Sequence, residues 1–442
     1  LAPIIAFPPE MMLARAALHP LRSLPSAATR SLAVDAAQLE DTAAQLLKRH
    51  GVAGVQAAVI DAGEVIPVNG GLADVASGTP VASTTLFQLA SLSKPVAARR
   101  ALTRFDADAA VNPLLAAHGS PWRIEGQDGW GDAVTVSHLI DHSALGLHYV
   151  PGVPSTEQFP SSLELVSGRA EKWGYAAVEC VKKPGSAFAY SGGGFLVLQH
   201  LLECALGPEK ALAPCGGRFG YELDGAPSGD SLVDFGFDVP AGKTHAVGYR
   251  DGGEALGRLW FPPFAAGAMG TASGLGEWLC GLSKAHRDRG DGMHAVAKLM
   301  LERRKDLGAG AFMGARMGRG IFIRDVASGD ARNPDRWMLH QAANDGFRGL
   351  FLVCFDGPSA TNGPRGLVIL SNGDNDAMLF NMAMARAMLE ALEPAGFDLG
   401  RVPDVAAGFD TAGMRQEEIV NLGFKGLVLD AFAEAPGFEL GK

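Results

Sequence analysis

Phe87–Ala98 reads FQLASLSKPVAA, a segment in which Ser91 precedes Lys94 by three residues. Side chains three residues apart lie on the same face of a helix, so we expect the Ser91 hydroxyl and the Lys94 amine to be within hydrogen-bonding distance. A lysine amine can take the proton of a serine only when burial or a nearby cation lowers the pKa of the amine. The segment supplies apolar flanking residues for such burial: Phe87, Leu89, Leu92 and Val96. It therefore predicts an activated serine nucleophile, although S-x-x-K alone also fits a solvated helix surface.

Composition and charge narrow the class of protein. The chain has 442 residues, 47% of them hydrophobic, which is enough for one large domain or two intergrown ones with an ample core. The formal net charge of −10 argues against nucleic acid or an anionic membrane surface as the main partner. No apolar run reaches the roughly 20 residues that a membrane-spanning helix needs. We therefore expect a soluble globular protein whose partner is a small molecule, with neutral and cationic substrates both open.

The cysteines and glycines indicate neither a metal nor a cofactor. The five cysteines are scattered, without a C-x-x-C pair or the histidine spacing of a metal site: Cys180, Cys204, Cys215, Cys280 and Cys354. They predict free, mostly buried thiols in a reducing compartment rather than a disulfide framework. The chain also contains no phosphate-binding or dinucleotide-binding glycine motif. We therefore expect chemistry without a cofactor.

The N-terminal stretch leaves the localisation open. Met11–Ala33 contains arginines and serines and no acidic residue, a composition typical of an organelle transit peptide. A disordered leader or an ordered arm on the domain surface fits the same composition and is favoured. We therefore expect a cytoplasmic protein, with organelle targeting as the alternative.

Hydrophobic patterning predicts strands near both ends of the chain and helices between them. The expected strands are Val52–Ile60, Glu64–Val68, Arg319–Ile323, Trp337–His340, Gly349–Phe355 and Gly366–Leu370. Helical spacing predicts helices over Asp35–Arg49 and Ala377–Leu392. We expect an α+β fold in which the two ends close one antiparallel sheet and a helical region is inserted over roughly residues 100–260. The catalytic domain then spans residues 35–392, between an N-terminal extension (1–34) and a C-terminal extension (393–442).

Three features of the inserted region bear on function. Tyr190 precedes the glycine run Gly192–Gly194, where backbone can approach a ligand closely, and beside a lysine its phenol can relay protons. By themselves the residues favour a tyrosine that packs its ring at a boundary. His142 fits a ligand or base, and fits better a structural histidine near the end of a helix beginning at Thr135. Pro151–Ser167 predicts a long surface loop of the kind that shapes substrate pockets.

Three stretches, in this order, resemble the motifs of the β-lactamase-like serine hydrolases. Ser91–Lys94 resembles S-x-x-K, and Tyr190–Gly192, with its Pro184-Gly185 lead-in, resembles Y-x-N or Y-S-x. His340–Phe347, HQAANDGF, resembles K-T-G or its H-x-G variant. The segments LIDHSALGL at 139–147 and AAGAMGTASGL at 265–275 are similar to supporting segments of this family. The resemblance covers roughly residues 35–392, and the order and spacing of the motifs make it specific.

The resemblance implies a fold and a mechanism. The fold is that of β-lactamases and penicillin-binding proteins, with the site between an antiparallel sheet flanked by helices and an all-helical region. Ser91 would attack a carbonyl and form an acyl-enzyme, while Lys94, helped by Tyr190, accepts its proton and passes it to the leaving group. The backbone N–H groups of Ser91 and Ala343 would form the oxyanion hole. His340 would line the strand edge and polarise the substrate or leaving group.

Two departures from the family pattern concern the substrate. Gly192 stands where β-lactamases have an asparagine that contacts the substrate amide, and His340-Gln341-Ala342 stands where they have Lys-Thr-Gly. Gly192 and Ala342 remain candidate substrate-binding positions. The cation that binds the carboxylate of a β-lactam or peptide terminus is missing from the third motif, which favours neutral esters. Both changes resemble the family VIII carboxylesterases among the class C β-lactamase-like proteins.

The sequence thus predicts a serine carboxylesterase that acts on small or short-acyl esters, with weak β-lactam hydrolysis as a conceivable side activity. The alternatives are a penicillin-binding-type peptidase or amidase, an acyltransferase and a β-lactamase. Acyl transfer and hydrolysis differ only in the nucleophile that reaches the acyl-enzyme. A non-catalytic scaffold of the same fold is less favoured, because Ser91, Lys94 and Tyr190 are all present.

Overall fold

The computed structural model describes residues 34–147, 149–215, 233–237, 243–304, 307, 315–326 and 333–392. The predicted C-terminal extension (393–442) and all but the last residue of the predicted N-terminal extension (1–34) lie outside these residues. The boundaries of the two extensions therefore stay predictions. In the described part of the chain, no helix combines the length and the apolar character needed to cross a membrane.

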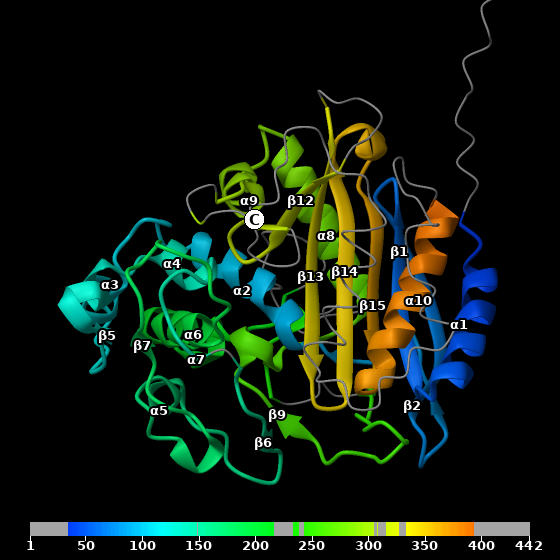
Figure 1. Ribbon diagram of the computed structural model, residues 1–442, viewed down its shortest axis with the longest axis horizontal. Helices are drawn as coiled ribbons and strands as arrows, with labels where there is room; N and C mark the ends of the chain where they lie inside the picture. The colour runs from blue at the N-terminus through cyan, green and yellow to red at the C-terminus, as the bar shows by residue number, and fades with distance from the viewer. Residues whose placement is uncertain are drawn as a thin grey trace, which may run out of the picture. The chain divides into compact units, whose positions relative to one another are not determined.

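Strands from both ends of the chain form one antiparallel sheet. Among the described residues it has eight strands in the order β11-β12-β13-β14-β15-β1-β2-β3 (Figure 1). Their bounds are β1 Gly54–Asp61, β2 Glu64–Asp74, β3 Thr79–Pro80, β11 Arg316–Met317, β12 Phe322–Val326, β13 Asp335–Asn344, β14 Phe347–Asp356 and β15 Arg365–Ser371. β1 pairs with β15, with Val55 opposite Ser371, and so joins the N-terminal hairpin to the C-terminal strands. The predicted α+β fold is confirmed.

Helices cover both faces of the sheet (Figure 1). α1 (Ala36–His50) and α10 (Asn375–Leu392) pack on one face, and α8 (Ala272–Arg287) packs on the other. Because side chains alternate along a strand, β1 contributes to two cores. Ala57 and Val59 pack in the core with α1 and α10, whereas Ala58 and Ile60 pack in the core with α8. A strand buried on both faces has a continuous apolar sequence, as β1 does.

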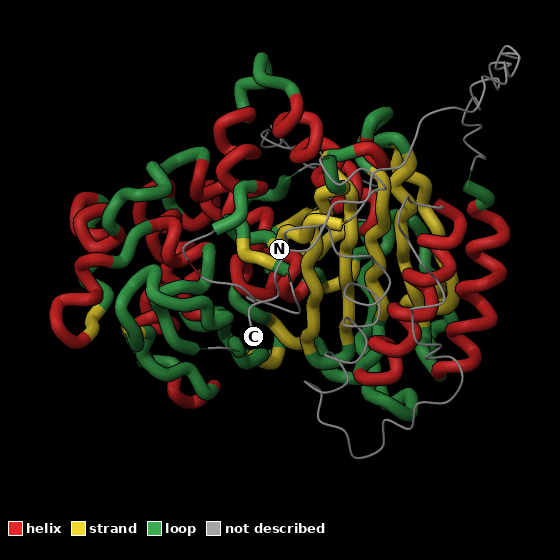
Figure 2. The backbone as a smooth tube through the Cα atoms, turned by 45° about the horizontal axis from the view of Figure 1, so that its top comes forward, coloured by secondary structure: helices red, strands yellow, loops and turns green. Residues whose placement is uncertain are grey.

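The helical insertion lies between the two groups of strands in the chain. Its helices are α2 Ser93–Leu102, α3 Val111–Ala117, α4 Val136–Ile140, α5 Ser162–Val166, α6 Gly193–Leu206 and α7 Pro208–Ala211, and α9 His294–Leu301 follows α8. Its short paired strands are β4 Phe87–Gln88, β5 Glu125–Gly126, β6 Val153–Pro154, β7 Glu179–Cys180, β8 Val233–Asp234, β9 Leu259–Trp260 and β10 Met269–Gly270. α6 packs against α2, α4, α5 and α7 in the group of helices beside the sheet (Figure 2). This central position explains why residues on every side of α6 are buried from Gly193 to Leu202.

Two segments differ from the predictions. The helix expected to run from Thr135 to the turn at Gly146 ends at Ile140, and His142 has a φ of +61°, which a right-handed helix cannot contain. The segment Pro151–Ser167, expected to be a surface loop, contains α5 and contributes Val153 and Leu165 to the core. It is therefore partly structural.

Gln56 on β1 generates a test of how the sheet supports the segment before Ser91. Its buried amide donates hydrogen bonds to the carbonyls of Ala82 (2.7 Å) and Thr85 (3.1 Å) and accepts one from the N–H of Ala272 (2.6 Å) at the start of α8. We expect Gln56→Leu to lower the free energy of unfolding by about 2–4 kcal/mol, because these buried groups lose their partner. Urea denaturation followed by circular dichroism measures the change. Gln45→Leu on the exposed side of α1 is the control, and equal losses in the two variants would contradict the prediction.

Candidate active site

Ser91 lies on a tight turn immediately before helix α2. The 3₁₀ turn Ala90–Leu92 joins β4 to α2, and Ala90 adopts a φ of +45°, a conformation that residues with a side chain rarely take. The Ser93 hydroxyl donates to the Ala90 carbonyl (2.6 Å) and accepts from the Ala268 N–H (3.1 Å), which holds the turn in place. The expectation that Ser91 sits within the helix is therefore corrected. Ser91 precedes the helix that carries Lys94, and strain of this kind is typical of functional sites.

Lys94 occupies the first turn of α2 and points into the protein. Its Nζ lies 3.1 Å from the Ser91 Oγ and 2.5 Å from the Ala265 carbonyl oxygen, and the residue is 2% exposed. The same Nζ lies 5.0 Å from the ring centroid of Tyr190 and 5.6 Å from that of Phe195. Burial lowers the pKa of Lys94 from its usual 10.5 to about 7, because a charged amine loses its hydration there. A large fraction of the amine is therefore neutral near pH 7 and able to accept a proton.

Tyr190 completes a group of three polar side chains. Its phenol and the Ser91 hydroxyl are hydrogen-bonded, while burial raises the pKa of Tyr190 above its usual value. The phenol therefore keeps its proton near neutral pH until a neighbour removes it. Ser91 and Tyr190 are each half-buried, so the hydroxyl is within reach of solvent. The structure thus brings together the hydroxyl, the amine and the phenol that the sequence pattern singled out.

The glycine run after Tyr190 accommodates the chain's own backbone. The N–H groups of Gly192 and Gly193 donate to the Leu147 carbonyl (2.8 and 3.1 Å). A Cβ at Gly193 would lie 2.6 Å from the Gly146 carbonyl oxygen, and one at Gly194 would lie 2.4 Å from the Leu139 carbonyl oxygen. We expected this run to admit a ligand, but the close approaches are made by α4 and the segment that follows it. Only glycine lets these segments press against the start of α6.

The third motif lies on β13, which packs beside the Ser91 turn. Ala343 is half-buried, whereas His340 and Ala342 are buried. The His340 Nδ1–H donates to the Gln341 carbonyl (2.7 Å), and the ring lies among those of Phe322, Tyr190 and Phe351, with centroids 5.2, 6.3 and 6.4 Å away. Burial, followed by the charge of Lys94, lowers the pKa of His340 to about 3, so the imidazole is neutral.

The placement of His340 differs from the expectation that it lines the strand edge and polarises the substrate. Its Nε2 is buried, and no hydrogen-bond partner for that atom is present in the described part of the chain. The reason is that the alternation along β13 turns His340 toward the core that contains Met338 and Ala342. The ring therefore forms part of the apolar wall behind Lys94 and Tyr190.

Two polar residues near the motif were not predicted. The Asn344 amide donates to the Gln88 Oε1 (2.9 Å) and to the Ala266 carbonyl (3.0 Å), and so ties the end of β13 to β4 and to the turn that contacts Lys94. Arg348 on β14 donates to the Asn344 and Phe347 carbonyls and pairs with Asp374 (3.0 Å). The sequence contains one signal for the connection between β13 and β4. Asn344 is a polar residue at the end of a strand, and a buried polar side chain needs a hydrogen-bond partner.

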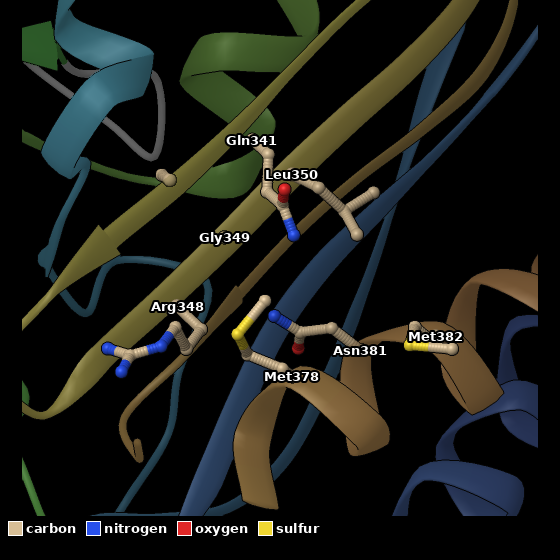
Figure 3. Close-up of a pocket in the computed structure, with 8 residues that line it drawn as sticks. Gln341, Arg348, Gly349, Leu350, Met378, Asn381 and Met382 are labelled. Atoms are coloured by element: carbon tan, nitrogen blue, oxygen red, sulfur yellow. The ribbon is translucent and has the colours of Figure 1, made fainter. Parts of the chain in front are cut away.

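The opposite side of β13 is partly polar. A small cavity of about 10 Å³ lies between β13, β14 and α10. Figure 3 shows the Gln341 side chain extending from the strand toward Met378 and Asn381 on the helix. The residues around it are Gln341, Ala342, Arg348, Gly349, Leu350, Met378, Asn381 and Met382. Side chains of β13 thus contact both layers of the fold. In the described part of the chain, no group of three or more His, Cys, Asp or Glu side chains is arranged to hold a metal ion.

Comparisons with known proteins identify the family of the chain. A family model described as Beta-lactamase matches residues 39–392. A crystal structure of SurE is similar over 84% of this chain and 78% of its own, with a TM-score of 0.56 and 19% sequence identity. A structure of SurE with D-Leu is similar over 80% of this chain and 75% of its own, with a TM-score of 0.54 and 19% identity. At this identity the two structures show a shared fold, whereas the family match extends over most of the chain. The chain therefore belongs to the beta-lactamase family, the β-lactamase-like serine hydrolases.

Proposed function

We propose that this protein is a serine carboxylesterase that hydrolyses small or short-acyl esters through an acyl-enzyme on Ser91. One observation carries the proposal: the Ser91 hydroxyl is hydrogen-bonded to the Lys94 amine at 3.1 Å and to the Tyr190 phenol, and the amine is buried. A serine is activated when an adjacent base can take its proton, and burial gives Lys94 a pKa of about 7 that suits this task. The proposal assigns the site to a catalytic domain over residues 35–392, with a mainly helical part over roughly residues 100–260.

The reaction follows from the positions of these groups. The Ser91 Oγ attacks the ester carbonyl while Lys94 takes its proton, and the backbone N–H groups of Ser91 and Ala343 stabilise the negative charge that develops on the carbonyl oxygen. When the tetrahedral intermediate collapses, the Tyr190 phenol donates its proton to the leaving alcohol and is reprotonated by the Lys94 ammonium. A water molecule then attacks the acyl-enzyme by the same proton transfers in reverse, which releases the acid and restores Ser91.

Neutral esters fit the site better than carboxylates do. A substrate that carries a carboxylate needs a cation or an amide to bind it. His340 does not supply the cation, and Gly192 does not supply the amide. The imidazole of His340 is neutral because its pKa lies near 3, and Gly192 has no side chain to offer. On β13 the proposal leaves Ala343 to contribute its N–H, with His340 and Ala342 buried behind it.

The proposed function predicts an acyl-enzyme on Ser91. After brief exposure of the protein to a panel of short-chain esters, amides and β-lactams, intact-protein mass spectrometry should show an acyl adduct from the esters that disappears in Ser91→Ala. Ser77→Ala, at an exposed serine, is the matched control and should retain the adduct. Adducts formed mainly from β-lactams would instead favour a β-lactamase or a penicillin-binding-type enzyme, and transfer of the acyl group to an added alcohol or amine in preference to water would favour an acyltransferase. No adduct on Ser91 from any of these substrates would favour a non-catalytic scaffold.

The pH dependence of turnover follows from the pKa of Lys94. The amine must be neutral to act as a base, so kcat/KM for a neutral ester should rise about tenfold per pH unit below pH 7 and level off above it. His340 should add no inflection between pH 5 and 9, because its pKa lies near 3. A profile of kcat/KM from pH 5 to 9 measures this. A profile that is flat through pH 7 would rule out Lys94 as the base.

Burial of Lys94 should also appear in the stability of the protein. Its pKa is about 7 in the folded state against 10.5 when exposed, so the unfolded state binds more protons between these pH values and the free energy of unfolding falls as pH drops from 10.5 to 7. Lys94→Met removes the free-energy cost of burying the amine. The difference between the two pKa values sets an upper limit of about 5 kcal/mol for this cost. The Ala265 carbonyl loses its partner, which reduces the expected gain at pH 7 to about 1–3 kcal/mol. Urea denaturation at pH 7 and 9.5 should show a gain that shrinks at the higher pH, together with loss of activity. The exposed Lys48→Met is the control, and a gain that is independent of pH would contradict the explanation.

A further inference from the structure

His142 contacts the peptide segment that carries Tyr190 on both sides of that residue. The His142 carbonyl oxygen accepts a hydrogen bond from the Ala189 N–H (2.8 Å). The Nδ1 of its ring lies 3.0 Å from both the N–H and the carbonyl oxygen of Ser191. Whichever ring nitrogen carries the proton, His142 is therefore bonded to the residues immediately before and after Tyr190.

The ring of His142 also packs on the ring of Tyr190. The two ring centroids are 4.4 Å apart with an interplanar angle of 26°, which is a stacked arrangement. Phe195 and Phe188 enclose the imidazole at centroid distances of 5.5 and 5.8 Å, and the residue is 1% exposed. Stacking of this kind fixes the plane of the Tyr190 ring and hence the direction of its phenol oxygen.

The backbone of His142 is held in an unfavourable conformation. Its φ of +61° places it in the left-handed region, which side chains other than Asn, Asp and His seldom occupy. The conformation turns the chain sharply after α4 and brings the imidazole against Tyr190, since α4 ends at Ile140, two residues earlier. A buried residue with a positive φ that bonds to both neighbours of one side chain and stacks on its ring points to a role in positioning that side chain.

We propose that His142 is a positioning residue, which holds the Tyr190 phenol in the orientation needed to protonate the leaving group. The proposal rests on the proposed function, in which Tyr190 donates a proton to the leaving alcohol. A basic alkoxide needs that proton, whereas a p-nitrophenolate leaves without it. Loss of His142 therefore slows the hydrolysis of alkyl esters more than that of p-nitrophenyl esters, and lowers kcat more than it raises KM.

A double-mutant cycle tests the proposal on an ethyl ester and a p-nitrophenyl ester with the same acyl group. His142→Asn keeps a residue that tolerates a positive φ but removes the ring. We expect it to lower kcat on the ethyl ester by about tenfold, and to lower the acylation rate on the p-nitrophenyl ester, measured from the burst of p-nitrophenolate, by less than about twofold, as expected for a misplaced proton donor. Tyr190→Phe should lower kcat on the ethyl ester by about a hundredfold. In the Tyr190→Phe background, His142→Asn should lower kcat on the ethyl ester by less than about a further twofold. The effects of the two substitutions are not additive if both residues act through the same phenol.

His200 on α6 provides the matched control. It is also a buried histidine, 4% exposed, and its two ring nitrogens lie 3.0 Å from the Ser162 Oγ and 2.9 Å from the Ser120 Oγ. His200→Asn should lower the melting temperature without changing the ratio of the two ester rates. If His142→Asn fails to fold, His142→Gly, which accepts a positive φ without strain and also lacks the ring, enters the same cycle and should show the same selectivity for the ethyl ester.

The outcomes separate the inference from the proposed function. Equal losses on the two esters, or a full additional loss in the Tyr190→Phe background, would show that His142 only supports the fold and would overturn the inference. If Tyr190→Phe keeps the wild-type rate on the ethyl ester, Tyr190 is not the proton donor, and the proposed mechanism fails at that step together with the inference. A selective, non-additive loss supports both.

Discussion

The buried amine of Lys94 is the constraint on which the site depends. An ammonium group loses several kcal/mol of hydration when it is removed from water, and the protein avoids part of this cost by letting the amine lose its proton. The surroundings that enforce this come from distant parts of the chain: the Tyr190 and Phe195 rings and the Ala265 carbonyl. Burial that weakens the stability of the fold therefore leaves the amine neutral near pH 7 and able to accept a proton, a common relation between stability and activity.

The links that hold these parts together are polar and cross between layers. Gln56 joins the sheet to the start of α8 and to the segment that leads to Ser91, and Asn344 joins the end of β13 to β4. Both amides are buried. Gln56 uses its NH₂ group and its oxygen, and Asn344 donates two hydrogen bonds from its NH₂ group. If one of the connected elements moved, these buried groups would lose their hydrogen-bond partners. Hydrophobic packing brings the layers together without direction, whereas these hydrogen bonds determine the register at which the three motifs meet.

The third motif differs from the Lys-Thr-Gly pattern that the sequence resemblance led us to compare it with. In place of the lysine, β13 presents a histidine that faces inward among Phe322, Phe351 and Tyr190. An imidazole in such surroundings is neutral, because neither water nor a carboxylate stabilises its charged form. Tyr190 is the ring that the two sites share: it lies beside His340 and under the Lys94 amine, and burial lowers the pKa of both groups.

The sequence by itself determined what depends on neighbouring residues. The apolar runs of strands such as Gly349–Phe355 and the spacing of Ser91 and Lys94 act over a few positions. They were sufficient to predict the α+β fold and the three motifs. The tertiary structure alone decided that Ser91 precedes its helix, that His142 takes a positive φ against Tyr190 and that His340 faces the core. It also decided the bond between Asn344 and Gln88, which are 256 residues apart. Such contacts follow from how separate segments pack, and a pattern within one segment carries no record of the groups that pack against it.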